Sequence, residues 1–362
     1  MKNHQEWLRM APCLHEGPLS HVGMQLLATA DTLPRDPFSD SLLVWATYTI
    51  FRSMETAFAG EKDPTAPIQK GFEEANHFLA AAAGLSFPRN EFSFVSDAPS
   101  PSTATVAAVT GDHYGNLFRG FDSEHYYGEA TRLLESRLQR NDIDITGLPA
   151  WDVLDAGCGG GRYSVAWARL GARSVTGIDF SRVGIQDALA RTAGAYPQVI
   201  FQEADVLNIP FTDGRFDCVF SNGVLHHSEN WQLGVSELVR VMKKGGLGWI
   251  YLIEDPGGYF WDIIEILRAL LRSVDKMQAR RALGVLGVPG NRIFYMLDHI
   301  LVPINLRLRA EEIVECLRTS GAKEMRRLVR GCDFDRCEQI HQKVPFATMK
   351  YGAGEHRIVF TK

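Results

Sequence analysis

The chain has 362 residues, of which 45% are hydrophobic and 22% charged, a balance typical of globular proteins and not of disordered or fibrous ones. Its formal net charge of −5 provides no overall positive field to attract phosphate backbones or anionic membranes, so a nucleic-acid substrate is disfavoured. The length exceeds one ordinary domain and predicts a core with an additional module.

The start of the chain and its cysteines predict a cytoplasmic protein. No apolar segment follows a basic start, so we expect no secretory signal. The longest early apolar run, residues 41–51, is shorter than the roughly 20 residues of a membrane-spanning helix. Reduced thiols are the simplest interpretation of cysteines without disulfide spacing. The cysteines are Cys13, Cys158, Cys218, Cys316, Cys332 and Cys337.

The first part of the chain predicts a helical module. Apolar residues recur at helical spacing over residues 44–58, and a second helix is expected over residues 63–84. A stretch rich in Pro, Ser, Thr and Ala follows at residues 96–105 and is typical of a linker. We therefore expect residues 1–105 to form an N-terminal helical module and linker, and residues 106–362 to form the second domain. The helices either dock a macromolecular partner or form a homodimer interface.

From Trp151 onward, short apolar runs alternate with helical segments, which predicts a parallel sheet wrapped by helices. The last two predicted strands would pair antiparallel at one edge. The predicted fold class is therefore α/β, with a doubly wound, seven-stranded, mostly parallel sheet. The expected strands are residues 151–157, 172–180, 198–205, 215–222, 246–254, 325–331 and 356–362.

A glycine-rich loop follows the first of these strands. Gly157, Gly159 and Gly161 come after Asp155 in the pattern acid-x-Gly-x-Gly-x-Gly. Glycines allow the backbone to turn sharply and to approach a ligand closely. A dinucleotide loop of the form GxGxxG that began at Gly157 would need glycine where Arg162 stands. The carboxylate at the strand end suits a ligand with an ammonium group, such as a methionine moiety, and is badly placed against a pyrophosphate.

Acids also end the next two predicted strands. Asp179 either accepts hydrogen bonds from both hydroxyls of a ribose or caps the helix that follows it. Asp205 is placed to accept a hydrogen bond from an adenine amino group, while the Val206 N–H meets a ring nitrogen. Suitable groups at three successive strand ends predict a nucleotide site at the carboxyl edge of the sheet.

Four motifs in order over roughly residues 150–255 resemble the class I S-adenosylmethionine-dependent methyltransferase family, and are closest to its small-molecule methyltransferases. They are VLDAGCGGGRYSVA, VTGIDFS, ADVLNIPFTDGRFDCVFSNGVLHHSEN and ELVRVMKKGGLGWIYLI. The resemblance implies a Rossmann-like methyltransferase fold and S-adenosylmethionine as cofactor. The cofactor-binding residues that it implies are Asp155, Gly157, Gly159, Gly161, Asp179, Phe180, Asp205, Val206, Asn222 and Gly223.

Methyl transfer from a sulfonium mainly requires that the nucleophile be held in line with the methyl group, and a hydroxyl or carbon nucleophile usually also needs a base. His226 and His227 follow the fourth strand, and Glu254 ends the fifth, so these are the candidate catalytic residues. The histidine pair either contains a base or has no such role. Glu254 either faces the site or lies in a solvated turn. Residues 221–224 depart from the Asn-Pro-Pro-aromatic pattern of methyltransferases that modify DNA bases, which disfavours that activity.

Residues 256–309 form an insertion after the fifth strand, where this family commonly places a helical substrate lid. The amphipathic stretch within it, residues 258–274, either packs on the core or lies on a membrane or a hydrophobic substrate.

Two smaller groups of side chains leave alternatives open. Aromatic residues before the first strand either enclose the methyl group or pack against one another; they are His113, Tyr114, His125, Tyr126 and Tyr127. Cys332, Cys337 and His341 are too few and too loosely spaced for a zinc site, so no metal is predicted.

We expect an enzyme that methylates a small molecule on oxygen, nitrogen or carbon, for example in specialised metabolism. One alternative is a protein or RNA methyltransferase that uses the N-terminal helices as a docking module. A second alternative is a scaffold that binds the cofactor without turnover, and this alternative predicts binding without any methylated product.

Overall fold

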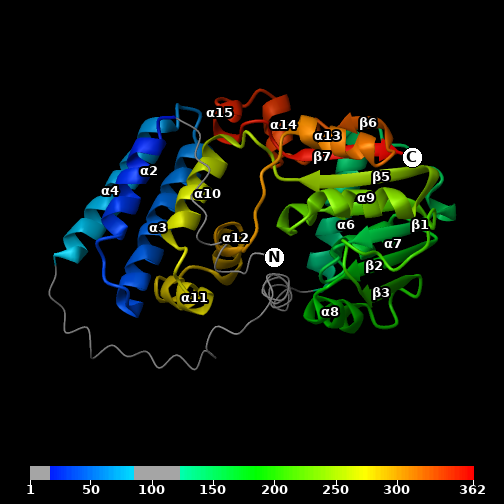
Figure 1. Cartoon of the computed structure of the whole chain (residues 1–362), viewed down its shortest axis with the longest axis horizontal. Helices are drawn as coiled ribbons and strands as arrows, with labels where there is room; N and C mark the ends of the chain where they lie inside the picture. Colours follow the sequence, from blue (N-terminus) through cyan, green and yellow to red (C-terminus); the bar gives the residue numbers. More distant parts are fainter. Residues whose placement is uncertain (1–16, 85–122) are drawn as a thin grey trace. The chain divides into compact units, whose positions relative to one another are not determined.

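A computed structural model describes residues 17–84 and 123–362, and these residues divide into two compact units (Figure 1). The described part of the first unit comprises residues 17–84, 257–303 and 344–352, and the remainder belongs to the second unit. This division differs from the predicted domain boundaries, because most of the 256–309 insertion groups with the N-terminal helices. The boundary expected near residue 105 lies outside the described residues.

The first unit, which we call the helical unit, is built from helices that range from blue to red in Figure 1. The longest of them begins at Pro37, where the Asp36 carboxylate accepts a hydrogen bond from the Ser39 N–H at 2.7 Å. The helices are α2 (Ser20–Ala30), α3 (Pro37–Ala59), α4 (Thr65–Ala83), α10 (Gly258–Leu270), α11 (Lys276–Val285), α12 (Gly290–Leu301) and α15 (Ala347–Tyr351).

Helix α10, the predicted amphipathic segment, is a core helix of this unit. It packs against α2, α3, α12 and α15. A Cβ added at Gly23 of α2 would lie 2.5 Å from Cδ1 of Ile266, which shows how closely α2 and α10 approach. The burial extends around α10, so the alternative of a helix that lies on a membrane is not supported. Its buried side chains include Tyr259, Phe260, Trp261, Ile263, Ile264, Ile266 and Leu267.

A buried lysine fixes the end of α3. Lys350 is 1% exposed, and its Nζ donates hydrogen bonds to the carbonyl oxygens of Phe58 and Gly60, both at 2.9 Å. A cation at this position stabilises the carbonyl groups that end a helix. Burial lowers the pKa of Lys350. The short helix α15 is thereby held against α3.

The second unit, which we call the α/β unit, contains a seven-stranded sheet in the order β3-β2-β1-β4-β5-β7-β6. Strands β1 to β5 are parallel, while β7 runs antiparallel to both β5 and β6. This arrangement confirms the predicted fold class. The strands are β1 (Asp152–Ala156), β2 (Ser174–Asp179), β3 (Val199–Glu203), β4 (Phe216–Asn222), β5 (Met242–Leu252), β6 (Lys323–Arg327) and β7 (His356–Thr361).

Both faces of this sheet are covered by helices, which explains why its strands appear as continuous apolar runs in the sequence. Neighbouring residues of β1 illustrate the two faces: Leu154 belongs to one buried cluster and Val153 to the other. The helices are α6 (Ser123–Arg140), α7 (Arg162–Arg169), α8 (Arg182–Thr192), α9 (Trp231–Val241), α13 (Ala310–Thr319) and α14 (Arg336–His341), with short 3₁₀ turns η2 (Leu148–Ala150) and η3 (Leu225–His227). Across the described ranges, no helix has the length and apolar character needed to cross a bilayer.

A buried ion cluster joins α6, α14 and β7. The Asp335 carboxylate accepts two hydrogen bonds from Arg137, each 2.8 Å, and one from Arg357 at 3.1 Å. Burial alone would raise the pKa of Asp335, but the two guanidinium groups hold it below its ordinary value. Cys337 lies beside the cluster, with its Sγ 3.4 Å from Nη1 of Arg357. In the part of the chain that the structure describes, no three His, Cys, Asp or Glu side chains are arranged to hold a metal ion.

A second ion cluster lies where the chain passes between the units. Arg336 contacts Glu254 at 3.1 Å and Glu355 at 3.5 Å. Glu254 stands just before the chain enters the helical unit at residue 257, and Glu355 stands just after the chain returns at residue 353. Arg336 itself lies between the two excursions into the helical unit, residues 257–303 and 344–352, so one guanidinium joins the chain before the first to the chain after the second.

We expect Asp335→Asn to lower the free energy of unfolding by about 3–5 kcal/mol, because it removes the carboxylate paired with buried Arg137 and one of the two carboxylates paired with buried Arg357. Urea denaturation followed by tryptophan fluorescence measures this loss.

The matched control is Asp333→Asn, two residues away. The Asp333 side chain is 80% exposed and pairs with Arg140 at the surface, so its loss is expected to cost less than about 1 kcal/mol. Equal losses in the two variants would show that the buried cluster contributes no more than a surface pair.

Candidate functional site

The glycine-rich loop connects β1 to α7, next to the point where the strand order reverses between β1 and β4. The N–H groups of Gly157 and Cys158 both donate to the carbonyl oxygen of Ile178 in β2, at 2.8 and 2.9 Å. Gly161 forms the N-cap of α7. The loop is therefore fixed to the neighbouring strand, in the position where open parallel sheets commonly bind nucleotides.

The three loop glycines serve different needs, although all have positive φ, at 85°, 52° and 78°. A Cβ at Gly157 would lie 2.3 Å from Cγ2 of Val224, and one at Gly161 would lie 2.5 Å from Cζ of Phe201. A Cβ at Gly159 would have no heavy atom of the described residues within 4 Å. Packing thus requires the outer two glycines, whereas Gly159 faces open space.

Asp179, at the end of β2, holds the loop from the other side. Its Oδ2 accepts a hydrogen bond from the Gly159 N–H and its Oδ1 accepts one from the Ser181 N–H, both 2.8 Å. Burial raises the pKa of Asp179, and these two N–H groups act in the opposite direction. The N-cap of α8 is Ser181, whose hydroxyl accepts the Gly184 N–H at 3.1 Å. Asp179 is therefore not the helix cap that the sequence left open as an alternative.

Asp155 points into the protein and not toward the open side of the loop. It is 2% exposed, and its Oδ2 accepts a hydrogen bond from the Ser164 hydroxyl at 2.6 Å. Burial raises the pKa of Asp155 to about 7, and the nearby charge of Asp179 acts in the same direction. This geometry does not provide the direct contact between Asp155 and a ligand ammonium group that the sequence suggested.

The residues after β3 form the outer part of the candidate site. Asp205 is exposed, and its Oδ1 accepts a hydrogen bond from the Leu207 N–H at 2.8 Å, while Val206 is buried. Phe180 follows Asp179 and is half-buried. An exposed carboxylate in a fixed turn remains available to a ligand on this side of the sheet.

The ends of β4 and β5 bring a tyrosine to the site that the sequence analysis missed. Asn222 is paired in register with Tyr251, and its Oδ1 accepts a hydrogen bond from Trp249 Nε1 at 3.4 Å. Gly223 has φ of 84°, and a Cβ there would lie 3.5 Å from the Tyr251 ring. The rings of Tyr251 and His226 lie 5.8 Å apart. The signal that could have revealed Tyr251 is a polar aromatic residue near the carboxyl end of a central strand.

The two histidines after β4 are in contact but are not equivalent. Their ring centroids are 4.1 Å apart. His226 is 2% exposed, whereas His227 is half-buried, and its Nδ1 lies 2.7 Å from the carbonyl oxygen of Ile304. Because a carbonyl only accepts hydrogen bonds, Nδ1 of His227 carries the proton, and the neutral ring has its lone pair on Nε2.

Glu254 differs from both roles that the sequence left open. It is fully buried and paired with Arg336, so it neither lies in a solvated turn nor presents a carboxylate to an open site. A carboxylate engaged by a guanidinium is a poor proton acceptor, because the positive charge stabilises its ionised form.

Behind the glycine loop, Tyr126 and Tyr127 pack with Val165 and Tyr196. The Tyr127 hydroxyl donates to the Gly160 carbonyl oxygen at 3.4 Å, and burial raises the pKa of Tyr127 to about 12. These two residues therefore support the loop as ordinary aromatic packing. His113 and Tyr114 lie outside the described residues, and the side chain of His125 is not described.

Comparison with known proteins identifies the region that carries this site. Residues 154–250 match the family model for a methyltransferase domain. The 27-O-demethylrifamycin SV methyltransferase of Amycolatopsis mediterranei is 33% identical over 152 residues, which cover 40% of this chain and 54% of that protein. A malonyl-[acyl-carrier protein] O-methyltransferase of Buchnera aphidicola is 37% identical over 95 residues, covering 26% of this chain and 36% of that protein.

Among solved structures, an S-adenosylmethionine-dependent methyltransferase from Aquifex aeolicus is similar with a TM-score of 0.41 and 14% identity, over 70% of this chain and 98% of that one. The chain thus spans about half or less of the length of the curated relatives named above. The matched segment runs from β1 through β5 and contains the glycine loop, Asp179, Asn222 and the histidine pair. Residues 154–250, which carry the candidate site, are therefore similar to a methyltransferase domain.

Proposed function

We propose that this chain binds S-adenosylmethionine at the carboxyl edge of its sheet and transfers the methyl group to a small-molecule acceptor. The observation that carries the proposal is the juxtaposition of Gly159, which faces open space, with the Asp179 carboxylate that accepts its N–H. The match of the same region to a methyltransferase domain supports it.

The described residues fit the cofactor. Gly159 lets a ligand approach the backbone of the loop where any side chain would intrude. Each Asp179 oxygen already accepts one backbone N–H, which fixes the carboxylate, and each retains a lone pair for a ribose hydroxyl. Asp205 would hold the adenine amino group beside Val206. Asn222 would lie with Gly223 beside the methionine moiety, and Phe180 would flank the ribose.

We assign Asp155 a different role from the one predicted. Its carboxyl group holds the start of α7 through Ser164. The start of α7 carries Gly161, so this contact positions the loop without touching the ligand.

When bound, the cofactor supplies a methyl group on a sulfonium that is already activated for in-line displacement. The protein has to hold the acceptor in line and, for a hydroxyl acceptor, remove its proton. We propose His227 as the base, because the Ile304 carbonyl oxygen fixes the orientation of its ring through Nδ1 and because it is less buried than His226. The paired Glu254 is better suited to position the end of β5.

The names of the relatives support a small-molecule acceptor and favour oxygen as the methylated atom. The homodimer through the N-terminal helices, the absence of a nucleic-acid substrate and the cytoplasmic location stay predictions. Formation of a methylated product distinguishes an enzyme from a scaffold that only binds the cofactor.

The first experiment is calorimetric titration of S-adenosylmethionine into the wild-type chain and into Gly159→Ala. We expect micromolar binding to the wild type and at least about tenfold weaker binding to the variant, because its methyl group occupies space that the ligand needs.

The control for this variant is Gly214→Ala, which lies before β4. Gly214 has φ of 64°, and its added Cβ likewise meets no described heavy atom within 4 Å. Both variants are expected to lose about 1–2 kcal/mol of stability from the left-handed backbone, but only Gly159→Ala should lose the cofactor. Equal binding by all three proteins would contradict the proposed site.

Activity is tested by transfer of tritium from methyl-labelled S-adenosylmethionine to a panel of small hydroxyl, amine and carboxylate compounds. For a hydroxyl acceptor, His227→Gln should slow labelling by about 100-fold at pH 7 while leaving cofactor affinity within about threefold. His341→Gln, at an exposed position on α14, is the control and should label at the wild-type rate. Cofactor binding without labelling of any compound would favour the scaffold alternative.

The raised pKa of Asp155 predicts a dependence of stability on pH. An acid whose pKa is higher in the folded state than in the unfolded chain stabilises the fold fully when the pH is below the unfolded pKa. For Asp155 this stabilisation is lost as the pH rises from about 4 to about 7. Asp155→Asn mimics the neutral acid, so the fall in unfolding free energy between pH 5 and pH 8 should shrink by about 3 kcal/mol. Parallel profiles for wild type and variant, measured by urea denaturation, would show that Asp155 does not titrate in this range.

A further inference from the structure

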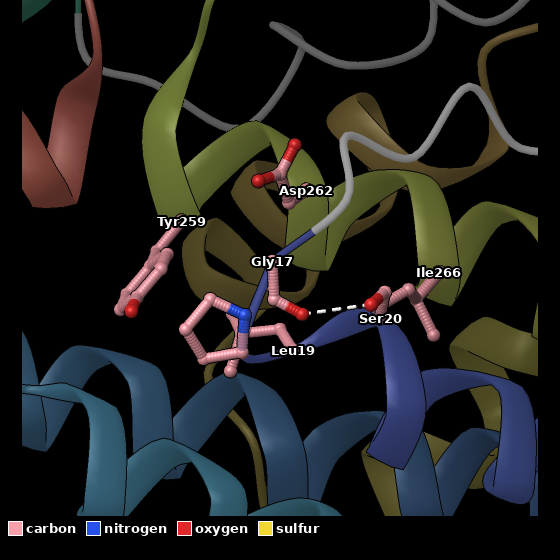
Figure 2. Close-up of a pocket in the computed structure, with 7 residues that line it drawn as sticks. Gly17, Leu19, Ser20, Tyr259, Asp262 and Ile266 are labelled. Atoms are coloured by element: carbon pink, nitrogen blue, oxygen red, sulfur yellow. Dashed lines mark hydrogen bonds between the residues drawn. The ribbon is translucent and has the colours of Figure 1, made fainter.

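The helical unit contains a cavity that the proposed methyl transfer does not explain. Its volume is about 200 Å³, enough for a small organic molecule. A second cavity of the same unit has a volume of about 20 Å³, room for about one water, and lies where Ser20 donates to the Gly17 carbonyl beside Tyr259 (Figure 2). The larger cavity is lined by Tyr48, Phe51, Glu55, Val288, Arg292, Tyr295 and Met296.

Two helix faces form the larger cavity. On α3, residues 48, 51 and 55 recur at helical spacing, and on α12 residues 292, 295 and 296 do the same. Side chains that project from one face of a helix are held in fixed positions, so the shape of the cavity is also fixed.

The interior of the cavity is apolar and its rim is aromatic. Phe51, Val288 and Met296 are between 2% and 7% exposed, whereas Tyr295 is 46% exposed. The rings of Phe51 and Tyr295 meet edge to face with centroids 6.1 Å apart. Aromatic rings favour such offset and edge-on contacts, so these walls suit a planar aromatic ring.

Two charged side chains of the lining pair with each other. Arg292 of α12 is ion-paired with Glu55 of α3, and their side chains are 46% and 30% exposed. Arg52 lies one helical turn from Tyr48, donates a hydrogen bond to its hydroxyl at 3.4 Å, and lies 6.0 Å from its ring centroid. Among the described lining residues, Arg292 is the guanidinium and Glu55 is the carboxylate. A surface ion pair contributes little stability, so a ligand carboxylate can replace Glu55 on Arg292.

We propose that this cavity binds a small aromatic carboxylate, with its ring against Phe51 and Tyr295 and its carboxylate on Arg292. The site lies wholly within the helical unit, and the ligand class follows from its lining alone. A failure of this inference therefore leaves the proposed methyl transfer untouched, and the converse also holds.

The test is calorimetric titration of the full chain with three probes. Benzoate has both features, benzamide has the ring without the charge, and cyclohexanecarboxylate has the charge without the aromatic ring. We expect saturable benzoate binding that is at least about tenfold tighter than that of either other probe, the effect of losing one charge-assisted hydrogen bond or the aromatic contact.

Three variants assign the binding to this cavity. Arg292→Gln should weaken benzoate binding by about tenfold, whereas Glu55→Gln should strengthen it severalfold, because it removes the carboxylate that competes for Arg292. Arg280→Gln makes the same charge change at an exposed position of α11 and should leave the affinity unchanged.

Three outcomes would overturn the inference. The first is that the protein, shown to be folded by circular dichroism, does not bind benzoate saturably. The second is that benzoate and benzamide bind with equal affinity. The third is that Arg280→Gln and Arg292→Gln change benzoate affinity equally.

Discussion

The candidate cofactor site depends on how one backbone loop is fixed to one strand. The N–H groups of Gly157 and Cys158 donate to Ile178, and the Gly159 N–H donates to the Asp179 carboxylate at the end of the same strand. These bonds use the N–H groups of three successive residues and hold the loop against β2. In the loop held in this way the three glycines have positive φ angles, and Gly159 faces open space.

A second constraint acts where β5 ends. The chain first leaves the α/β unit after residue 256 and returns to it for the last time at residue 353, and Arg336 pairs with Glu254 just before the first point and with Glu355 just after the second. Buried charges of this kind are costly when unpaired, so the pairing specifies a particular arrangement of the ends of β5 and β7. Tyr251 on β5 is thereby held beside Gly223 and the histidine pair. The ends of β5 and β7 are organised by charge, whereas the glycine loop is organised by backbone hydrogen bonds.

Much of this architecture was predictable because its determinants are local in the sequence. Parallel strands buried on both faces produce continuous apolar runs in the sequence, and these runs predicted the positions of the strands. The glycine pattern was recognised from its place directly after the first predicted strand. The missed features depend on contacts between distant residues. The inward direction of Asp155 depends on Ser164, the burial of Glu254 depends on Arg336, and the difference between the histidines depends on Ile304. The assembly of the helical unit from separate segments also leaves no local signal, since each helix by itself only shows an apolar stripe.

That assembly has a consequence for how the protein folds and how it can be shortened. The helical unit takes its helices from three segments: one before the first strand, one between β5 and β6, and one between β6 and β7. Its contacts therefore join residues far apart in the sequence, and such contacts form late because the intervening chain must first lose its freedom. A chain that lacked only residues 1–105 would retain α10 with the apolar surface that now packs against α2 and α3, and such surfaces promote aggregation. A deletion that respects the fold has to remove all three segments together.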